Sequence, residues 1–313
     1  MSLTWVSSSP HITKYNTVNT MMFDYIIALF PTIVLAVFIY GINYCLMILT
    51  SIISAVFFEI LYEIFSKQKF MLNDLSSVVT GMLIALSLPP NVPAYIPILA
   101  TGVAIILIKM CFGGNGSSFV SLVAVSRILV VVLLSTSFTN SFVAPTLVES
   151  NVSATPLITI IKSGADIPEF KYLIFGNFAG GIGETAIITL LVGGIYLCVR
   201  KVIDYKVPLI YLAIVAVIVL IFKGINYVIP YLASSGLILG AFFIATEFGS
   251  VPNSTTGEIL YAVFLGIATC LIWRFGDSVN AVYYAILFGG IINCVASNYY
   301  KPRPIGLKKG DSL

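Results

Sequence analysis

Charged side chains are scarce in this sequence. Only 9% of its 313 residues are Asp, Glu, Lys or Arg, while 59% are hydrophobic, and the mean hydropathy is +1.04. A soluble domain of this length does not need so much apolar surface, so lipid is the expected solvent for most of the chain. The net charge of +3 is too small to favour nucleic acid as a partner.

Cysteine and histidine are also few. His11 is the only histidine, and the five cysteines show no CxxC spacing. One histidine alone cannot build a haem or zinc site, and scattered cysteines in apolar segments predict neither disulfides nor zinc. We interpret the cysteines as small packing residues, with a cluster ligand shared with a partner subunit as the alternative. The chain alone is thus expected to hold no metal site and no catalytic residue.

Long apolar runs fill most of the remaining sequence. They predict an all-α integral membrane protein with about ten transmembrane helices, because a helical span needs about 20 mostly apolar residues. The ten runs lie at residues 22–41, 44–65, 77–90, 93–111, 119–136, 183–200, 207–222, 230–247, 256–274 and 279–298.

The distribution of Lys and Arg predicts that both termini are cytoplasmic. With this orientation only Lys162, Lys171, Lys223 and Arg274 fall outside, in agreement with the positive-inside rule. The remaining cations then fall inside: Lys14, Lys67, Lys69, Lys109, Arg127, Arg200, Lys201, Lys206, Lys301, Arg303, Lys308 and Lys309. The predicted organisation is a cytoplasmic segment 1–21, a first five-helix repeat 22–136, an extracytoplasmic loop 137–182, a second five-helix repeat 183–298 and a cytoplasmic tail 299–313.

The two halves contain a pair of similar stretches. Residues 80–90, an apolar run broken by Pro89 and Pro90, have a counterpart about 160 residues later at 240–249. Each is followed by an apolar run that ends in a cation near Phe-Gly, at Lys109 and at Arg274. Five spans in each half predict two inverted repeats whose broken helices meet near the bilayer midplane, although chance similarity between apolar runs remains the alternative.

Acidic residues near membrane depth are candidates for function because they are costly there. Asp24, Glu59 and Glu63 are expected at solvated ends of spans. Glu247 follows the broken eighth run and is the candidate to line an ion or cofactor region, with the hydroxyl of Thr246 beside it.

Several stretches, in order along the whole chain, resemble the NqrB/RnfD family. The resemblance is to the RnfD subunit of the Rnf ferredoxin–NAD oxidoreductase complex and, more distantly, to NqrB of the sodium-pumping NADH–quinone reductase. The matching stretches are Ser9-Pro10-His11, residues 28–31, 80–90, Lys109 with 112–114, 153–157, 180–185, 245–247, 272–276 and 302–306.

The resemblance implies a covalent flavin on the extracytoplasmic loop. Thr155, in the stretch Ser153-Ala154-Thr155, matches the threonine that carries FMN as a phosphodiester, attached by an ApbE-type flavin transferase. The family pattern reads roughly Asp-Gly-x-(Ser/Thr)-Gly-Ala-Thr, whereas this chain reads Glu-Ser-Asn-Val-Ser-Ala-Thr at residues 149–155. The acidic start, the alanine and the threonine are kept, and the glycine is not. A second, non-covalent flavin such as riboflavin is left open.

A glycine-rich stretch precedes the sixth run. It contains Gly180, Gly181, Gly183, Glu184 and Thr185. Such a turn at the start of a helix can bind an anion, and a contact to the flavin is one interpretation. Close helix packing through small residues is the other. The stretch lacks the lysine of a P-loop, so nucleotide hydrolysis is not expected.

The resemblance predicts a multi-pass protein of the bacterial cell membrane that relays electrons between ferredoxin and NAD, coupled to Na⁺ or H⁺ transport. It would work as one subunit of a translocase, with flavoprotein, iron–sulfur and NAD-binding subunits as partners. Two alternatives remain at this point. One is an NqrB-like subunit of a quinone reductase, against which the short polar N-terminus argues. The other is an inverted-repeat channel or secondary transporter without a redox cofactor.

Overall fold

The computed structural model describes residues 17–66, 74–114, 116–142, 181–252 and 254–299, together with Ile158 and Ile161. Within these ranges the chain forms helices and turns and no strand. The first half contains α1 (Val18–Tyr40), α2 (Ile42–Ser66), α3 (Ser76–Ser87), α4 (Tyr95–Gly102), the π-helix η2 (Val103–Met110), α5 (Leu122–Leu133) and α6 (Ser135–Thr139). The second half contains α9 (Ile182–Thr185), α10 (Ile187–Val199), α11 (Lys206–Lys223), α12 (Ile225–Leu232), α13 (Leu237–Leu239), the π-helix η3 (Gly240–Ile244), α14 (Thr255–Phe275) and α15 (Ala281–Tyr299).

The start of α1 differs from the predicted one. The helix begins at Val18, four residues before the predicted residue 22, because Thr17 and Thr20 form a capping box. The Thr20 backbone N–H donates to the Thr17 hydroxyl at 3.4 Å, and the Thr17 N–H donates to the Thr20 hydroxyl at 3.0 Å. The two threonine hydroxyls thus accept hydrogen bonds from backbone N–H groups at the start of the helix. Because these residues are polar, a search for apolar runs does not include them in the helix.

The predicted break after α3 is present. The helix ends at Ser87, and Leu88 is extended with φ −84° and ψ 155°, as expected for a residue that precedes proline. The eighth run, predicted at 230–247 as a broken span, is interrupted, but its bounds and the place of the break differ from the prediction. The helix already starts at Ile225, stops at Leu232 and resumes at Leu237 after a bend of 66°. Ser235 and Gly236, with φ +55° and +65°, make the break.

Four helices are long and apolar enough to cross a membrane by themselves, namely α1, α2, α11 and α14. The bent pair of α12 with α13 and η3 gives a fifth when taken as one span. The other apolar segments are shorter. Each of the ten predicted runs contains helix, so an all-helical membrane protein is confirmed, while the count of ten crossings and their inverted arrangement stay predictions.

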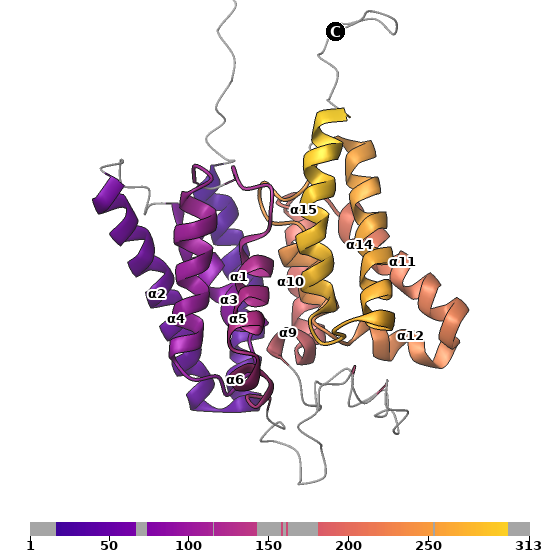
Figure 1. Ribbon diagram of the computed structural model, residues 1–313, viewed down its shortest axis with the longest axis horizontal. Coiled ribbons are helices and arrows are strands. Elements are labelled where there is room, and N and C mark those ends of the chain that lie inside the picture. The colour runs from indigo at the N-terminus through magenta and orange to yellow at the C-terminus, as the bar shows by residue number, and fades with distance from the viewer. Residues whose placement is uncertain are drawn as a thin grey trace, which may run out of the picture.

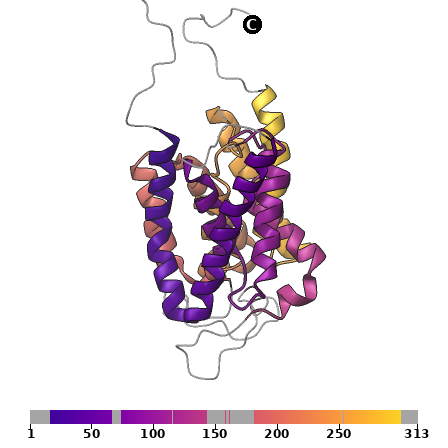
Figure 2. The same ribbon diagram turned by 90° about the vertical axis from the view of Figure 1, so that its left-hand side faces the viewer.

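The helices form two halves that lie side by side (Figure 1). In the first half α2 packs on α3 and α4; in the second α11 packs on α14 and η3. The halves meet where α1 packs on α10 and α5 packs on α15. The start of α1 and the end of α15 lie at one end of the molecule, and α6 and α9 lie at the opposite end (Figures 1 and 2).

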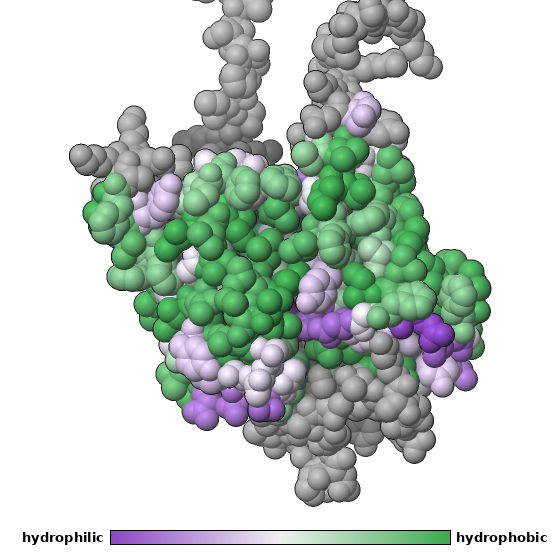
Figure 3. Space-filling view, in the orientation of Figure 1, coloured by the Kyte–Doolittle hydropathy of each residue, from purple (hydrophilic) through white to green (hydrophobic). Residues whose placement is uncertain are grey.

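Apolar side chains cover the outside of the helices as well as the core. Figure 3 shows a broad hydrophobic band across the visible face, with hydrophilic side chains gathered toward the end that carries α6. Large side chains on α1 and α11, such as Phe38 and Phe222, are more than 70% exposed. This is the surface expected of helices that face lipid.

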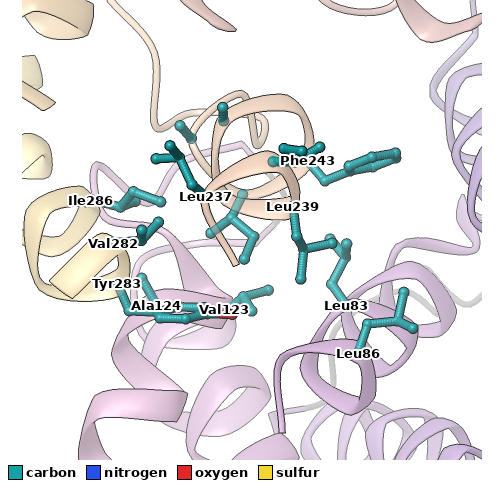
Figure 4. Close-up of a cluster of buried hydrophobic side chains, with 14 of the residues drawn as sticks. Leu83, Leu86, Val123, Ala124, Leu237, Leu239, Phe243, Val282, Tyr283 and Ile286 are labelled. Atoms are coloured by element: carbon teal, nitrogen blue, oxygen red, sulfur yellow. The ribbon is translucent and has the colours of Figure 1, made fainter. Parts of the chain in front are cut away.

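The broken segment lies at the centre of the core. Leu237, Leu239 and Phe243 lie between α3 and α15 (Figure 4). All three side chains are fully buried. A Cβ on Gly240 would lie 2.4 Å from Val282 of α15, so only glycine allows this approach. The interruption in the second half is therefore fixed in place by both halves of the molecule.

Candidate functional site

A buried arginine lies where the halves meet, at the α6 and α9 end. Arg127 of α5 is 1% exposed. Its Nε donates to the Oδ1 of Asn280 at 3.0 Å, and its Nη1 donates to the hydroxyl of Tyr283 at 3.4 Å. Its guanidinium carbon is 4.1 Å from the ring centre of Tyr283 and 5.1 Å from that of Phe138. We call this group, with the neighbouring Gly181, the loop-side junction.

The glycine-rich stretch passes next to this group. A Cβ on Gly181 would be 3.9 Å from the Nη1 of Arg127 and 3.7 Å from the carbonyl oxygen of Ser87. A Cβ on Gly183 would be only 2.4 Å from a methyl group of Leu239. Gly183 therefore has a packing role, whereas Gly181 lies beside a cation. Both glycines lie next to an interrupted segment, Gly181 beside Ser87 at the end of α3 and Gly183 beside Leu239 of α13.

Some of the predicted flavin-site residues cannot be placed. Ser153, Ala154, Thr155 and Gly180 lie outside the described residues, as does the side chain of Glu184. Thr185 is described and is buried at the end of α9. The described flanks of the loop, α6 and α9, meet the loop-side junction through Phe138 and Gly181.

A small cavity lies at the opposite end, near the start of α1. We call it the terminus-side cavity. It is lined by Met22, Tyr25, Ser76, Val79, Thr80, Leu83, Leu122, Phe243, Glu247 and Phe248. It thus draws on α1, α3, α5 and the residues around η3, which is the region where the two broken segments come together.

Glu247 joins this cavity to the start of α5. Its carboxylate accepts hydrogen bonds from the Ser121 hydroxyl at 2.6 Å and from the Leu122 backbone N–H at 3.0 Å. A carboxylate here caps the helix and matches its dipole. Thr246 is 8% exposed and donates its hydroxyl to the carbonyl of Phe242 at 2.6 Å. Of the two predicted ion-path residues, Glu247 is the one that lines the cavity.

A buried ion pair adjoins the same cavity. Lys109 and Glu59 are each 2% exposed and form a salt bridge. The ammonium of Lys109 also donates to the hydroxyls of Ser76 at 2.6 Å and Ser77 at 3.0 Å. Because Ser76 lines the cavity, this hydrogen-bonded group extends from Glu59 to the cavity that Glu247 also lines. The pairing of Glu59 with Lys109 could not be predicted from the sequence, because the two residues are 50 positions apart.

The expectation that Asp24, Glu59 and Glu63 lie at solvated span ends is wrong. Their exposed fractions are 6%, 2% and 3%, because each faces the bundle interior. Asp24 accepts a hydrogen bond from the Tyr196 hydroxyl at 2.8 Å and pairs with Arg200 at 3.2 Å.

Lys109 and Arg127, two of the cations counted on the cytoplasmic side, are buried within helices. They therefore carry less weight as loop charges, and the side on which they lie stays a prediction. The ten other cations assigned to the inside still outnumber the four assigned to the outside.

Among the described residues no group of three or more His, Cys, Asp or Glu side chains could hold a metal ion. An anionic cofactor is a better fit, because the Nη2 of Arg127 is buried and has no hydrogen-bond partner. Lipid-facing helices, interrupted segments at a central junction and buried charges at both ends define an integral membrane protein with internal polar sites.

Nearly the whole chain matches a known family. Residues 5–306 match the NQR2, RnfD, RnfE family, and the chain belongs to it. It is 32% identical over 308 residues to the D subunit of the Na(+)-translocating ferredoxin:NAD(+) oxidoreductase complex of Acetobacterium woodii, covering 97% of this chain and 96% of that protein. It is 29% identical over 319 residues to the D subunit of the proton-translocating ferredoxin:NAD(+) oxidoreductase complex of Clostridium ljungdahlii, again covering 97% and 96%. The D subunit of an ion-translocating oxidoreductase complex of Methanosarcina acetivorans is 29% identical over 302 residues, covering 96% of each chain.

Proposed function

We propose that the chain is a membrane subunit of an ion-translocating complex that moves electrons between ferredoxin and NAD(+). The family match over residues 5–306, with relatives named as the D subunits of such complexes, carries this proposal. The sequence has no dinucleotide-binding glycine fingerprint and no run of iron–sulfur cysteines. NAD(+) reduction and ferredoxin oxidation therefore belong to partner subunits.

The proposed topology has ten crossings of a bacterial cell membrane in two inverted halves. Both termini would be cytoplasmic and the loop 137–182 extracytoplasmic. The arrangement of the helices supports this, because α1 starts and α15 ends at one end of the molecule while α6 and α9 lie at the other (Figures 1 and 2). The excess of Lys and Arg on the terminal side favours this direction over the reverse.

Thr155 is the proposed attachment point for FMN, through a phosphodiester made by an ApbE-type transferase. The resemblance of residues 153–155 to the flavin-bearing stretch of the family supports it, as does the unpaired Nη2 of Arg127 beside the end of the loop. Bound FMN would supply reversible electron transfer. The chain would supply attachment, position and a compensating charge.

The variant Thr155→Val tests the flavin proposal. In a host that supplies the transferase, the intact mass of the wild-type chain should exceed the sequence mass by one FMN unit, and that of Thr155→Val should not. Denatured wild-type protein should also fluoresce as flavin on a gel. Ser153→Ala is the matched control and should keep the flavin. An unmodified wild-type chain in the assembled, active complex contradicts the proposal.

Glu247 is the proposed ion-path residue on the terminal side, with Thr246 as its neighbour. Glu247→Gln keeps an acceptor for Ser121 and Leu122 but removes the charge. We expect it to reduce ferredoxin-driven uptake of Na⁺ or H⁺ into inverted vesicles roughly tenfold. Glu258→Gln, which removes an acid of α14 that pairs with Lys206 at 3.6 Å, should transport normally. Equal transport by the two variants, per electron transferred, rules Glu247 out.

A further inference from the structure

The start of α5 is capped twice, once by its own chain segment and once by the other half of the molecule. The Ser121 hydroxyl accepts a hydrogen bond from the backbone N–H of Ala124 at 3.3 Å, the usual contact of a serine that precedes a helix. The Glu247 carboxylate accepts from the backbone N–H of Leu122 at 3.0 Å. The Ser121 hydroxyl also donates to the Oε2 of Glu247 at 2.6 Å. One hydroxyl thus joins the cap of the helix to the acid that lines the terminus-side cavity.

The cap alone does not require an acid at this place. A serine serves the start of a helix by itself, as Ser254 does for α14 by accepting from the N–H of Gly257 at 3.1 Å. At α5 a carboxylate from 126 residues away is added, and a charge between packed helices is costly. Because Ser121 is 1% exposed, its bond to this carboxylate is shielded from water. A hydrogen bond to an ionised group is about twice as strong as a neutral one, so this contact is strong enough to hold the carboxylate in one direction.

Backbone packing fixes the approach of Glu247 to α5. Gly249 has φ +87°, and a Cβ there would lie 2.6 Å and 2.7 Å from the carbonyl oxygens of Gly116 and Ser118. Only glycine permits this contact, so the segment after η3 lies directly on the segment that leads into α5. The backbone near Glu247 is thus held by packing, and the Ser121 hydroxyl acts on the direction of the side chain.

We propose that Ser121 is a positioning residue for ion transport, an inference that rests on the proposed function of Glu247. Its hydroxyl holds the Oε2 of the carboxylate at the start of α5 and so orients the group in the cavity, where the transported Na⁺ or H⁺ binds it. An ion on the carboxylate neutralises its charge, which weakens its interaction with the hydroxyl and with the helix dipole. Ser121 therefore competes with the ion for the carboxylate. This competition favours release, which a transport site needs as much as binding.

The test compares Ser121→Gly with Ser254→Gly in the assembled complex, in inverted vesicles driven by reduced ferredoxin. Glycine is nearly as good as serine at the start of a helix, so both variants should keep a Tm close to that of the wild type. Only Ser121→Gly removes a donor to Glu247. We expect it to lower Na⁺ or H⁺ uptake per electron roughly fivefold, less than Glu247→Gln does, because the Leu122 N–H still holds the carboxylate. Ser254→Gly should transport as the wild type, and Ser121→Thr, which keeps the hydroxyl, should recover most of the uptake.

A double variant separates a positioning role from a structural one. Ser121→Gly combined with Glu247→Gln should transport no worse than Glu247→Gln alone, because Ser121 acts through that carboxylate. A further loss in the double variant overturns the inference. So does wild-type uptake by Ser121→Gly, or an equal loss in Ser121→Gly and Ser254→Gly. Wild-type uptake by Glu247→Gln removes the proposed ion path as well, whereas a defect in Glu247→Gln with none in Ser121→Gly overturns this inference alone.

Discussion

Replacing Lys109 with methionine is expected to destabilise the protein by about 3–5 kcal/mol. Lys109 is 2% exposed, and its ammonium is bonded to Glu59, Ser76 and Ser77. Methionine fills the space but leaves the Glu59 carboxylate buried without its counter-charge. The expected result is a lower apparent Tm in detergent and less folded chain recovered from the membrane.

The ion pair itself is not expected to be the source of that stability. Desolvation of two charges offsets most of their attraction, so replacing both partners with apolar residues should cost much less than replacing one. The double variant Lys109→Met with Glu59→Met should therefore recover much of the Tm lost by Lys109→Met. Lys206→Met, which breaks a pair with Asp204 at the surface, is the matched control and should have little effect. A double variant as unstable as the single one would contradict this account.

Long apolar helices could be predicted closely from the sequence. The run at 256–274 corresponds to α14 at Thr255–Phe275, because the apolar run is bounded by a serine cap before it and by Gly276 after it. The position of the break in the eighth run could not be predicted. Ser235 and Gly236 lie inside a stretch whose composition stays apolar, and a positive φ at a serine depends on its partners. One such partner is the carbonyl of Ser278, to which the Ser235 hydroxyl donates at 2.7 Å.

For the candidate sites too, features within one short stretch could be predicted from the sequence, whereas contacts between distant residues could not. Residues 153–155 stand out by local sequence, and this is the basis of the flavin proposal. Glu59 and Lys109 are 50 residues apart, and only the register of α2 against η2 brings them together. The same holds for Arg127 and Asn280, which are 153 residues apart. Lys109 and Arg127 lie within apolar runs, where an isolated charge is costly and needs a partner. This position in the sequence could have identified both as buried, functional candidates.

The coupling ion does not follow from the fold. The relatives from Acetobacterium woodii and Clostridium ljungdahlii are named for Na(+) and for protons, although this chain aligns with 96% of each. Glu247 and Ser76 both line the terminus-side cavity, and the Glu247→Gln variant is the test of the ion path proposed above.

Replacing Gly193 with leucine is expected to separate the two halves of the molecule. A Cβ at this position would lie 2.4 Å from the carbonyl oxygen of Ala28 in α1, so the backbones of α1 and α10 must move apart. The buried face of α1 is narrow here because Ala28, Thr32 and Ala36 recur every four residues. Such small residues let helices approach closely in a membrane, where packing replaces the hydrophobic effect.

Gly193→Leu is expected to lower the free energy of unfolding by about 3 kcal/mol or more. This is the upper end of the range for overpacking, because the new side chain would clash with backbone atoms, which cannot change rotamer. Thermal unfolding and size-exclusion chromatography in detergent measure it as a lower Tm and a smaller monodisperse fraction. Val192→Leu adds bulk to the neighbouring residue of the same helix, which is 58% exposed, and should behave as the wild type. A Gly193→Leu protein that matches Val192→Leu in both measurements would show that the halves do not depend on this contact.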